Sequence, residues 1–189
     1  MQAKIEIRNL ETEELSIKMA VAQMLIAGFS DMSPQSWTNL NSAMEEVEES
    51  FAAGRISIVA VVGGKPVGWI AAIRQYNGNT YEIHPLVVHP DHRKMGVGAA
   101  LIKELERRVA DTGAMTLWLA SDDETGTTSL FDKELYPDPL TALKEIKNVR
   151  NHPFEFYQKM GFSLCGVLPD ANGLGKPDIF MAKRVRTLR

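Results

Sequence analysis

The chain has 189 residues, a formal net charge of −3 and one cysteine, Cys165. This length fits a single domain with a sizeable core, and we expect the domain to extend over residues 1–189. The charge, without a basic stripe interleaved with aromatics, argues against nucleic acid as a partner, and no apolar run is long enough to span a membrane. The first residues alternate between charged and apolar side chains, which is not the pattern of a signal peptide, and the chain has a lone cysteine. These two features indicate a cytoplasmic protein in which Cys165 is a buried core thiol.

The first fifty residues predict one strand and two helices. Ile5 and Ile7 alternate with charges, which is typical of a strand. Thr12 is placed to cap the first helix, whose apolar positions keep helical spacing at Leu15, Met19, Ala22, Ile26 and Phe29. The second helix has its apolar positions at Leu40, Met44, Val47 and Phe51 and stops at Gly54. We interpret its acidic residues as a solvated helix face; they are Glu45, Glu46, Glu48 and Glu49.

Three strands are predicted next, over residues 56–62, 67–76 and 80–89. Gly63-Gly64 separates the first two, and Asn77-Gly78-Asn79 separates the second and third. Both separators are hairpin turn sequences, so the three strands are expected to be antiparallel neighbours.

The third of these strands runs into a basic loop with two glycines, Arg93-x-x-Gly96-x-Gly98, which opens a helix over about residues 98–112. Such a loop can hold phosphate, because the first N–H groups of a helix lack internal partners and glycines allow close approach to the backbone. From the loop alone three readings remain: a plain strand-to-helix connection, a dinucleotide site and a coenzyme A site.

The remaining elements are a strand at about residues 115–119, a helix beginning at Pro153, and strands over residues 162–168 and 178–185. Residues 125–147 are the least readable part, with a short helix after Pro139. The element order is β-α-α-β-β-β-α-β-α-β-β. That order, with the glycine loop after the fourth strand, resembles the GNAT superfamily of N-acetyltransferases and favours the coenzyme A reading. The resemblance implies an α/β (α+β) GNAT fold whose mixed central sheet has about seven strands, with splayed fourth and fifth strands.

Longer motifs are similar to one branch of this superfamily, the aminoglycoside 6'-N-acetyltransferases. They are Tyr81-Glu82-Ile83-His84-Pro85-Leu86-Val87-Val88, Asn148-x-x-Asn151-His152-Pro153-Phe154-Glu155-Phe156-Tyr157-Gln158-Lys159-Met160-Gly161-Phe162, and Gly166-Val167-Leu168-Pro169-Asp170-Ala171-Asn172-Gly173 with the following Gly175-Lys176-Pro177-Asp178. Arg150 departs from the superfamily, in which an Asn at that position contacts the pantetheine arm. Asn148 and Asn151 are the alternatives for that contact.

The resemblance implies that acetyl-CoA is the co-substrate and that its pantetheine pairs with the fourth strand like an added strand. The implied cofactor-binding residues are Leu86, Val87, Val88, Arg93, Lys94, Met95, Gly96, Val97, Gly98 and Ala99. The amide of Leu86 would face the thioester carbonyl as an oxyanion donor. Tyr157 stands where the family protonates the departing thiolate, although its spacing with Phe154 and Met160 also fits a packed core tyrosine.

Glu82 and His84 share one face of the fourth strand, and either can relay a proton from a substrate ammonium. Glu82 and the cluster Asp122-Asp123-Glu124 lie near strand ends that border the expected cleft, where carboxylates would attract a small cationic amine. The resemblance implies an aminoglycoside; the alternatives are a polyamine, a protein or peptide amine, or a non-catalytic coenzyme A-binding module. The histidines show no metal-ligand spacing, so no metal is expected. Members of this branch pair as dimers, often through their last strands, which implies a homodimer.

Overall fold

The computed structural model describes residues 4–186, which form two compact units. The described parts of the first unit are residues 4–30, 34–117 and 185–186, and the second unit contains residues 31–33 and 118–184. Seven strands are hydrogen-bonded in the order β1-β2-β3-β4-β5-β7-β6. Within residues 4–186 no helix is both long and apolar enough to cross a bilayer.

The first unit contains the antiparallel strands of the predicted hairpins. The strands are β1 (Glu6–Asn9), β2 (Arg55–Val62), β3 (Lys65–Gln75) and β4 (Thr80–Val88), and each pairs with the next. Gly63 and Gly64 both have positive φ, at 57° and 80°, as a tight two-residue hairpin turn requires. The predicted turn residues therefore set the order of these strands.

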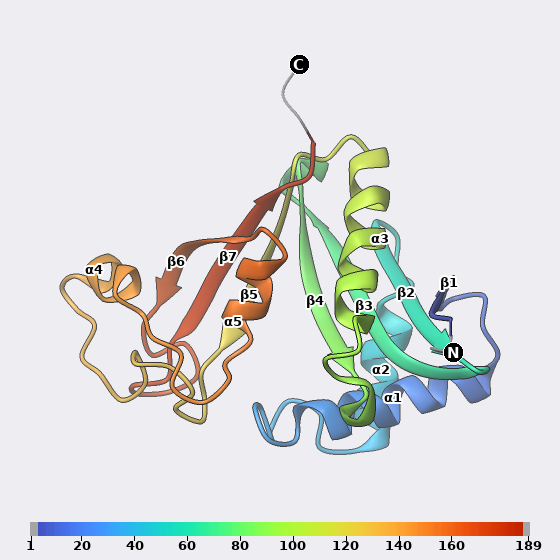
Figure 1. The fold of residues 1–189 in the computed structure, drawn as a ribbon, viewed down its shortest axis with the longest axis horizontal. Coiled ribbons are helices and arrows are strands. Elements are labelled where there is room, and N and C mark those ends of the chain that lie inside the picture. The colour runs from blue at the N-terminus through green and yellow to red at the C-terminus, as the bar shows by residue number, and fades with distance from the viewer. Residues whose placement is uncertain (1–3, 187–189) are drawn as a thin grey trace. The chain divides into compact units, whose positions relative to one another are not determined.

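Helices cover both faces of this sheet. They are α1 (Leu15–Phe29), α2 (Leu40–Glu49) and α3 (Val97–Asp111), and Figure 1 shows α3 running beside β3 and β4. Trp69 of β3 is buried in one cluster with Leu25 of α1 and Val47 of α2. The preceding residue, Gly68, faces α3, because a Cβ built on it would lie 2.7 Å from Val97. Neighbouring strand residues point to opposite faces, so α1 and α2 pack on one face and α3 on the other.

The buried side of α1 differs from the prediction. Leu15 and Met19 are exposed, at 63% and 39%, whereas Val21 and Leu25 are fully buried. Thr12 does not cap the helix, since its hydroxyl donates to the carbonyl of Asn9 and the N-cap is Glu14. The helix carries apolar residues on most of its sides, so spacing alone could not select the packed face.

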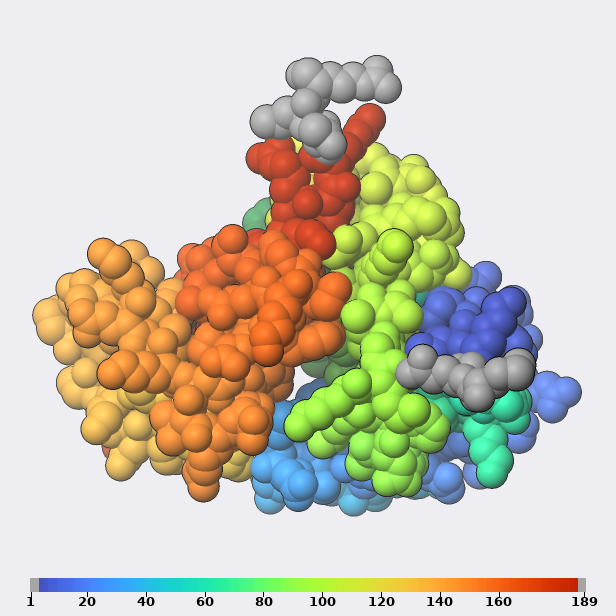
Figure 2. Space-filling model, viewed as in Figure 1, coloured from blue at the N-terminus to red at the C-terminus, as the bar shows by residue number. Residues whose placement is uncertain are grey.

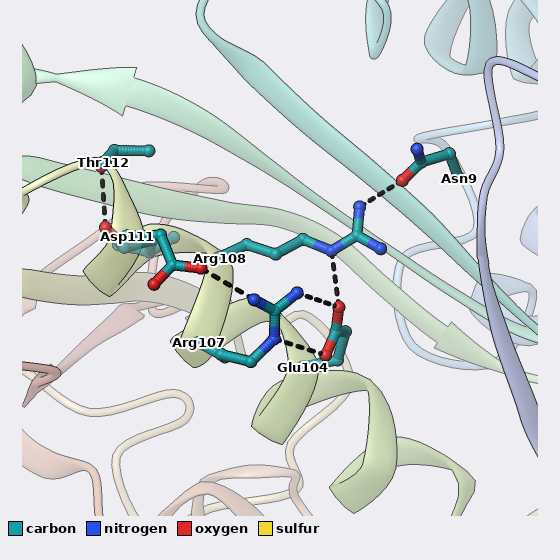
Figure 3. A network of polar contacts seen from close by, with 7 residues as sticks. Asn9, Glu104, Arg107, Arg108, Asp111 and Thr112 are labelled. Carbon is teal, nitrogen blue, oxygen red and sulfur yellow. Dashed lines mark hydrogen bonds and ion pairs between the residues drawn. The ribbon is translucent and has the colours of Figure 1, made fainter.

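A polar network attaches α3 to the first strand (Figure 3). Glu104 accepts hydrogen bonds from Arg107 and Arg108, and Arg108 also donates to the side chain of Asn9 at the end of β1. Hydrogen bonds from Arg107 and, with a smaller contribution, from Arg108 lower the pKa of Glu104 to about 2. Arg107 itself is well exposed, so its ion pairs contribute little stability, and the network mainly sets where α3 lies against β1.

The second unit contains most of β5 (Thr116–Asp122), with α4 (Pro139–Lys144), α5 (Phe154–Lys159), β6 (Ser163–Leu168) and β7 (Asp178–Arg184). β6 and β7 are antiparallel, and the pairing shifts register between Leu164 and Gly166. β6 is the last strand in the sheet order. The prediction that Cys165 is a buried core thiol is wrong, because Cys165 is exposed on this edge strand, whose outer edge pairs with no other strand of residues 4–186.

The predicted fold class is confirmed. All predicted strands and helices form, in the predicted order, and the short helix expected after Pro139 is α4, between β5 and α5. A single domain over residues 1–189 and the splay of the fourth and fifth strands stay predictions.

Candidate active site

Strand β4 carries the two residues predicted to relay a proton, and it has an irregularity in its middle. Between the pairs Ile70–Leu86 and Ala72–Ile83, one residue of β3 faces two residues of β4. This is a β-bulge at His84, and a bulge bends a strand and changes where its side chains point. His84 is accordingly the exposed residue in a strand whose neighbouring positions are buried or half-buried.

The bulge brings His84 to a carboxylate that the sequence analysis did not select. Nε2 of His84 lies 3.7 Å from a carboxylate oxygen of Glu46 on α2, and the ring of Trp37 is 6.1 Å away, centre to centre. Glu82, on the same strand, accepts a hydrogen bond of 3.2 Å from Gln75. Three groups that can hold or accept a proton thus lie on α2 and β4 of the first unit.

The interpretation of the acidic run as a solvated face holds for Glu45, Glu48 and Glu49, which are exposed, but is wrong for Glu46, whose side chain is only 15% exposed. The burial of Glu46 had a local signal in the sequence, namely its spacing from two other residues of the helix. Glu46 stands three residues after Ala43 and four before Ser50, positions on the same side of a helix, and both of these residues are buried.

The glycine loop has the conformation that anion binding requires. Gly96 is the N-cap of α3 with φ +86°, and a Cβ built on it would meet nothing within 4 Å. Gly96 has no side chain to cap the helix, and the first turn of α3 has no acidic residue, so the N–H groups there can face an external anion. Figure 2 shows the loop and α3, in green to yellow-green, at the surface of the viewed face.

Arg93, the predicted phosphate-binding cation, is held by backbone carbonyls. It donates from Nη2 to the carbonyl of Gly28 over 3.1 Å and from Nε to the carbonyl of Val88 over 3.4 Å. A guanidinium has five N–H donors, so these two bonds fix its plane and leave donors for an anion. Lys94 and Met95, the next loop residues, are exposed.

Tyr157 lies on α5 in the second unit and is 8% exposed. Its ring packs edge-on against Phe162, with ring centres 5.7 Å apart. Burial raises the pKa of the Tyr157 hydroxyl well above its usual 10.0. The hydroxyl therefore keeps its proton at physiological pH and is a weaker acid than that of an exposed tyrosine.

Asp123, a predicted substrate contact, is committed to the fold of its own loop. It is 1% exposed, and its two oxygens accept four hydrogen bonds of 2.7–2.9 Å from the backbone and hydroxyl groups of Thr127 and Thr128. Burial acts to raise the pKa of Asp123, but these hydrogen bonds outweigh it and hold that pKa below its usual value. We correct its expected role from substrate contact to support of the loop.

The neighbours of Asp123 are more accessible. Asp122 is exposed and accepts a hydrogen bond from the side chain of Asn172, and Glu124 is half-buried. The backbone carbonyl of Asp122 is 3.1 Å from Nε2 of His152. The other ring nitrogen of His152 accepts from an N–H group of α5, so Nε2 carries the proton and donates to Asp122. The carboxylates of Asp122 and Glu124 remain candidates for substrate contact.

Of the two alternatives for the pantetheine contact, Asn148 has structural hydrogen bonds, as does Arg150 at the position where the family has an Asn. The amide of Asn148 bonds both the N–H and the carbonyl of His152, and Arg150 donates to the carbonyls of Thr125 and Gly126. Asn151 is exposed, with a positive φ of 59°. The contact with the pantetheine arm stays a prediction for both asparagines.

Among residues 4–186 no group of three or more His, Cys, Asp and Glu side chains has the arrangement of a metal site.

Comparison with known proteins decides the family. Residues 21–135 match the model of the acetyltransferase (GNAT) family, a range that includes β2 to β4, the glycine loop and α3. The chain belongs to the GNAT acetyltransferase family. No curated protein sequence matches it.

Solved GNAT structures resemble the chain over nearly its whole length. One is a crystal structure of an aminoglycoside 6'-N-acetyltransferase complexed with coenzyme A, with 37% identity, 97% of this chain and 99% of that chain covered, and a TM-score of 0.90. Another is the aminoglycoside 6'-N-acetyltransferase from Enterococcus faecium, with the same identity and coverage and a TM-score of 0.87. An aminoglycoside 6'-acetyltransferase type Ii has 33% identity and a TM-score of 0.74 over the same coverage. The resemblance stated from the sequence motifs is thereby confirmed.

Proposed function

We propose that this GNAT acetyltransferase transfers an acetyl group from acetyl-CoA to the 6'-amine of an aminoglycoside. The observation that carries the proposal is the 37% identity, over 97% of the chain, to an aminoglycoside 6'-N-acetyltransferase complexed with coenzyme A. The similarity extends over both units, so it includes the residues of β4 and of α5 to which we assign chemistry.

The glycine loop and β4 are proposed to bind coenzyme A. The uncapped first turn of α3 and the exposed backbone at Gly96 support pyrophosphate binding, with Arg93 adding positive charge. The full proposed set is Leu86, Val87, Val88, Arg93, Lys94, Met95, Gly96, Val97, Gly98 and Ala99. Bound acetyl-CoA supplies the acetyl group as an activated thioester.

The residues assigned to the chemistry have separate roles in the proposal. The backbone amide of Leu86 donates a hydrogen bond to the oxyanion that forms when the amine attacks. Glu82 and His84 accept the proton that the substrate ammonium must lose before its nitrogen can act as a nucleophile. Tyr157 gives its proton to the departing thiolate, a role that rests on its place in the Phe156-Tyr157-Gln158-Lys159 motif shared with the family.

Carboxylates are proposed to select a substrate with several positive charges. Glu82, Asp122 and Glu124 form the revised set, without Asp123. Charge-assisted hydrogen bonds from such groups hold ammonium ions more tightly than neutral contacts do. A polyamine or a peptide amine would also be attracted, so the substrate class needs a direct comparison.

A coenzyme A-release assay over a panel of amines makes that comparison. The panel contains aminoglycosides with and without a 6'-amine, a linear polyamine and a peptide with a free amino terminus. We expect turnover only with 6'-amino aminoglycosides. Good turnover of the polyamine or peptide, with none of the aminoglycosides, would overturn the substrate assignment, and no turnover of any amine would indicate a non-catalytic binding module.

We also propose that the protein is a cytoplasmic homodimer. The exposed edge strand β6 supports pairing with a second copy, because an unpaired edge offers a row of backbone donors and acceptors. Light scattering at several protein concentrations measures the mass directly. A mass that stays at 21.0 kDa at all concentrations would contradict the dimer.

A further inference from the structure

Glu46 differs from the other carboxylates of α2 in what surrounds it. The other glutamates of α2 are exposed, whereas the carboxylate of Glu46 is turned inwards toward Nε2 of His84, 3.7 Å away. Burial acts to raise the pKa of Glu46, but hydrogen bonding by His84 and Trp37 and the charges of His84 and Arg55 outweigh it and lower that pKa. Glu46 is thus an ionised, half-buried partner of one histidine.

The contact also fixes how His84 presents its ring. Because Nε2 faces Glu46, Nδ1 is the nitrogen that can meet another molecule, and no group among residues 4–186 hydrogen-bonds to it. The side chain of His84 remains 46% exposed. A histidine with one nitrogen held by a carboxylate and the other accessible has the arrangement of a proton acceptor whose charged form is stabilised.

We infer that Glu46 is a positioning residue that orients His84 and stabilises its imidazolium form, which makes His84 the group that takes the proton from the substrate ammonium. This inference rests on the proposed acetyl transfer and chooses between the two predicted bases. The step balances: Nδ1 of neutral His84 accepts one ammonium proton, the positive charge passes from substrate to imidazolium, and the carboxylate of Glu46 stays ionised. The neutral amine is then free to attack the thioester.

Two of the three charged groups facing His84 increase its basicity. The carboxylate of Glu46 on α2, with an oxygen 3.7 Å from Nε2, raises the pKa of His84 above its usual 6.5; burial opposes this, the charge of Glu82 on β4 adds to it, and the charge of Arg55 on β2 opposes it. Arg55 forms an ion pair with another carboxylate, that of Glu49, over 3.4 Å. Glu46 is therefore the group whose removal should change His84 most.

The test compares Glu46→Gln with Glu45→Gln, which removes an exposed charge one residue earlier on the same helix. NMR titration of the imidazole signals, assigned with His84→Asn, measures the pKa of His84 in each protein. We expect this pKa to fall in Glu46→Gln and to stay at the wild-type value in Glu45→Gln. Glu46→Asp retains the charge on a shorter side chain and should give a smaller fall, and it serves as the test variant if Glu46→Gln does not fold.

The same variants are assayed for kcat/KM against pH with an amine substrate. His84 must be neutral to accept a proton, so the acid limb should move to lower pH in Glu46→Gln, and the plateau should fall about tenfold because a weaker base accepts the proton less readily. An unmoved His84 titration, or an unmoved acid limb in an active enzyme, overturns this inference alone. A wild-type protein that acetylates no amine, whatever the titration shows, overturns the proposed function together with the catalytic role of the pair.

Discussion

The guanidinium of Arg93 donates a 3.1 Å hydrogen bond to the backbone carbonyl of Gly28, a residue 65 positions earlier in the chain. Gly28 lies in the last turn of α1, where a positive charge is favourable because the carbonyls of a helix end carry partial negative charge. The second bond, to Val88 at the end of β4, makes Arg93 a bridge. The loop before α3 is therefore attached to a helix and a strand at once.

Replacing Arg93 by Lys should weaken coenzyme A binding about tenfold, although the charge is retained. A lysine ammonium has no planar fork and cannot hold both carbonyls while facing an anion. Isothermal titration calorimetry measures the affinity, and Lys103→Ala, which removes an exposed charge from α3, should leave it unchanged. Wild-type affinity in Arg93→Lys would mean that the charge alone matters.

Two substitutions at Gly96 separate backbone strain from ligand approach. Gly96→Ala should lower the free energy of unfolding by about 1–2 kcal/mol, because alanine disfavours a φ of +86°, whereas Gly96→Asn should cost less, since asparagine tolerates the left-handed conformation. Both should weaken coenzyme A binding about tenfold, because either adds a side chain where the pyrophosphate is expected. Urea unfolding and calorimetry measure the two effects.

A Cβ at Gly96 would meet no other part of the protein within 4 Å. A loss of affinity in a stable Gly96→Asn protein would therefore indicate a clash between the new side chain and the ligand. Unchanged coenzyme A affinity in that variant would contradict pyrophosphate binding at this loop.

Tyr157→Phe should lower the rate of the chemical step about 10²–10⁴-fold, because it removes the proton donor to the thiolate. The phenyl ring retains the packing against Phe162, so the stability of the protein should change little. Single-turnover kinetics are the measurement, since product release can hide the chemical step in steady-state rates. Tyr81→Phe, at a second buried tyrosine, is the matched control, and an equal rate in the two variants would assign Tyr157 to the core alone.

Asp123→Asn should destabilise the protein by about 3 kcal/mol, because an amide nitrogen would face donors that now bond to a carboxylate oxygen. The pKa of Asp123 is lowered in the folded state, so its contribution to stability is present above its usual pKa of 3.8 and is lost as the pH falls through the lower folded value. Urea unfolding at pH 7 and in steps down to about pH 2 measures the effect of the substitution and the pH dependence. Asp122→Asn, at an exposed neighbour, should change stability by under about 0.5 kcal/mol, and a similar loss in both variants would contradict the assignment.

The sequence predicted the strands well because local signals mark their ends. The glycines at 63 and 64 and the turn at residues 77–79 define two hairpins, and β2, β3 and β4 begin and end within two residues of the predicted limits. The glycine loop was also predictable, since its spacing determines where α3 starts. These features depend on neighbouring residues only.

Features that depend on distant contacts were not predictable in the same way. The contact between Glu46 and His84 involves a bulge in β4, and the exposure of Cys165 depends on β6 being an edge strand, and no local pattern reveals either feature. The role of Asp123 had a local signal, two threonines four and five residues later, but carboxylates near a strand end were interpreted as substrate contacts. Charge alone does not distinguish a group that binds a ligand from one that holds a loop.

The exposed position of Cys165 has a practical consequence. It is the only cysteine in the chain, so a thiol-reactive fluorophore would label the native protein at one site on β6 without any substitution. Burial raises the pKa of this thiol, so little thiolate is present at neutral pH, and labelling should speed up as the solution is made more alkaline. If two copies pair through β6, the labelling rate should fall as the protein concentration rises, which makes this single sulfur a reporter of assembly.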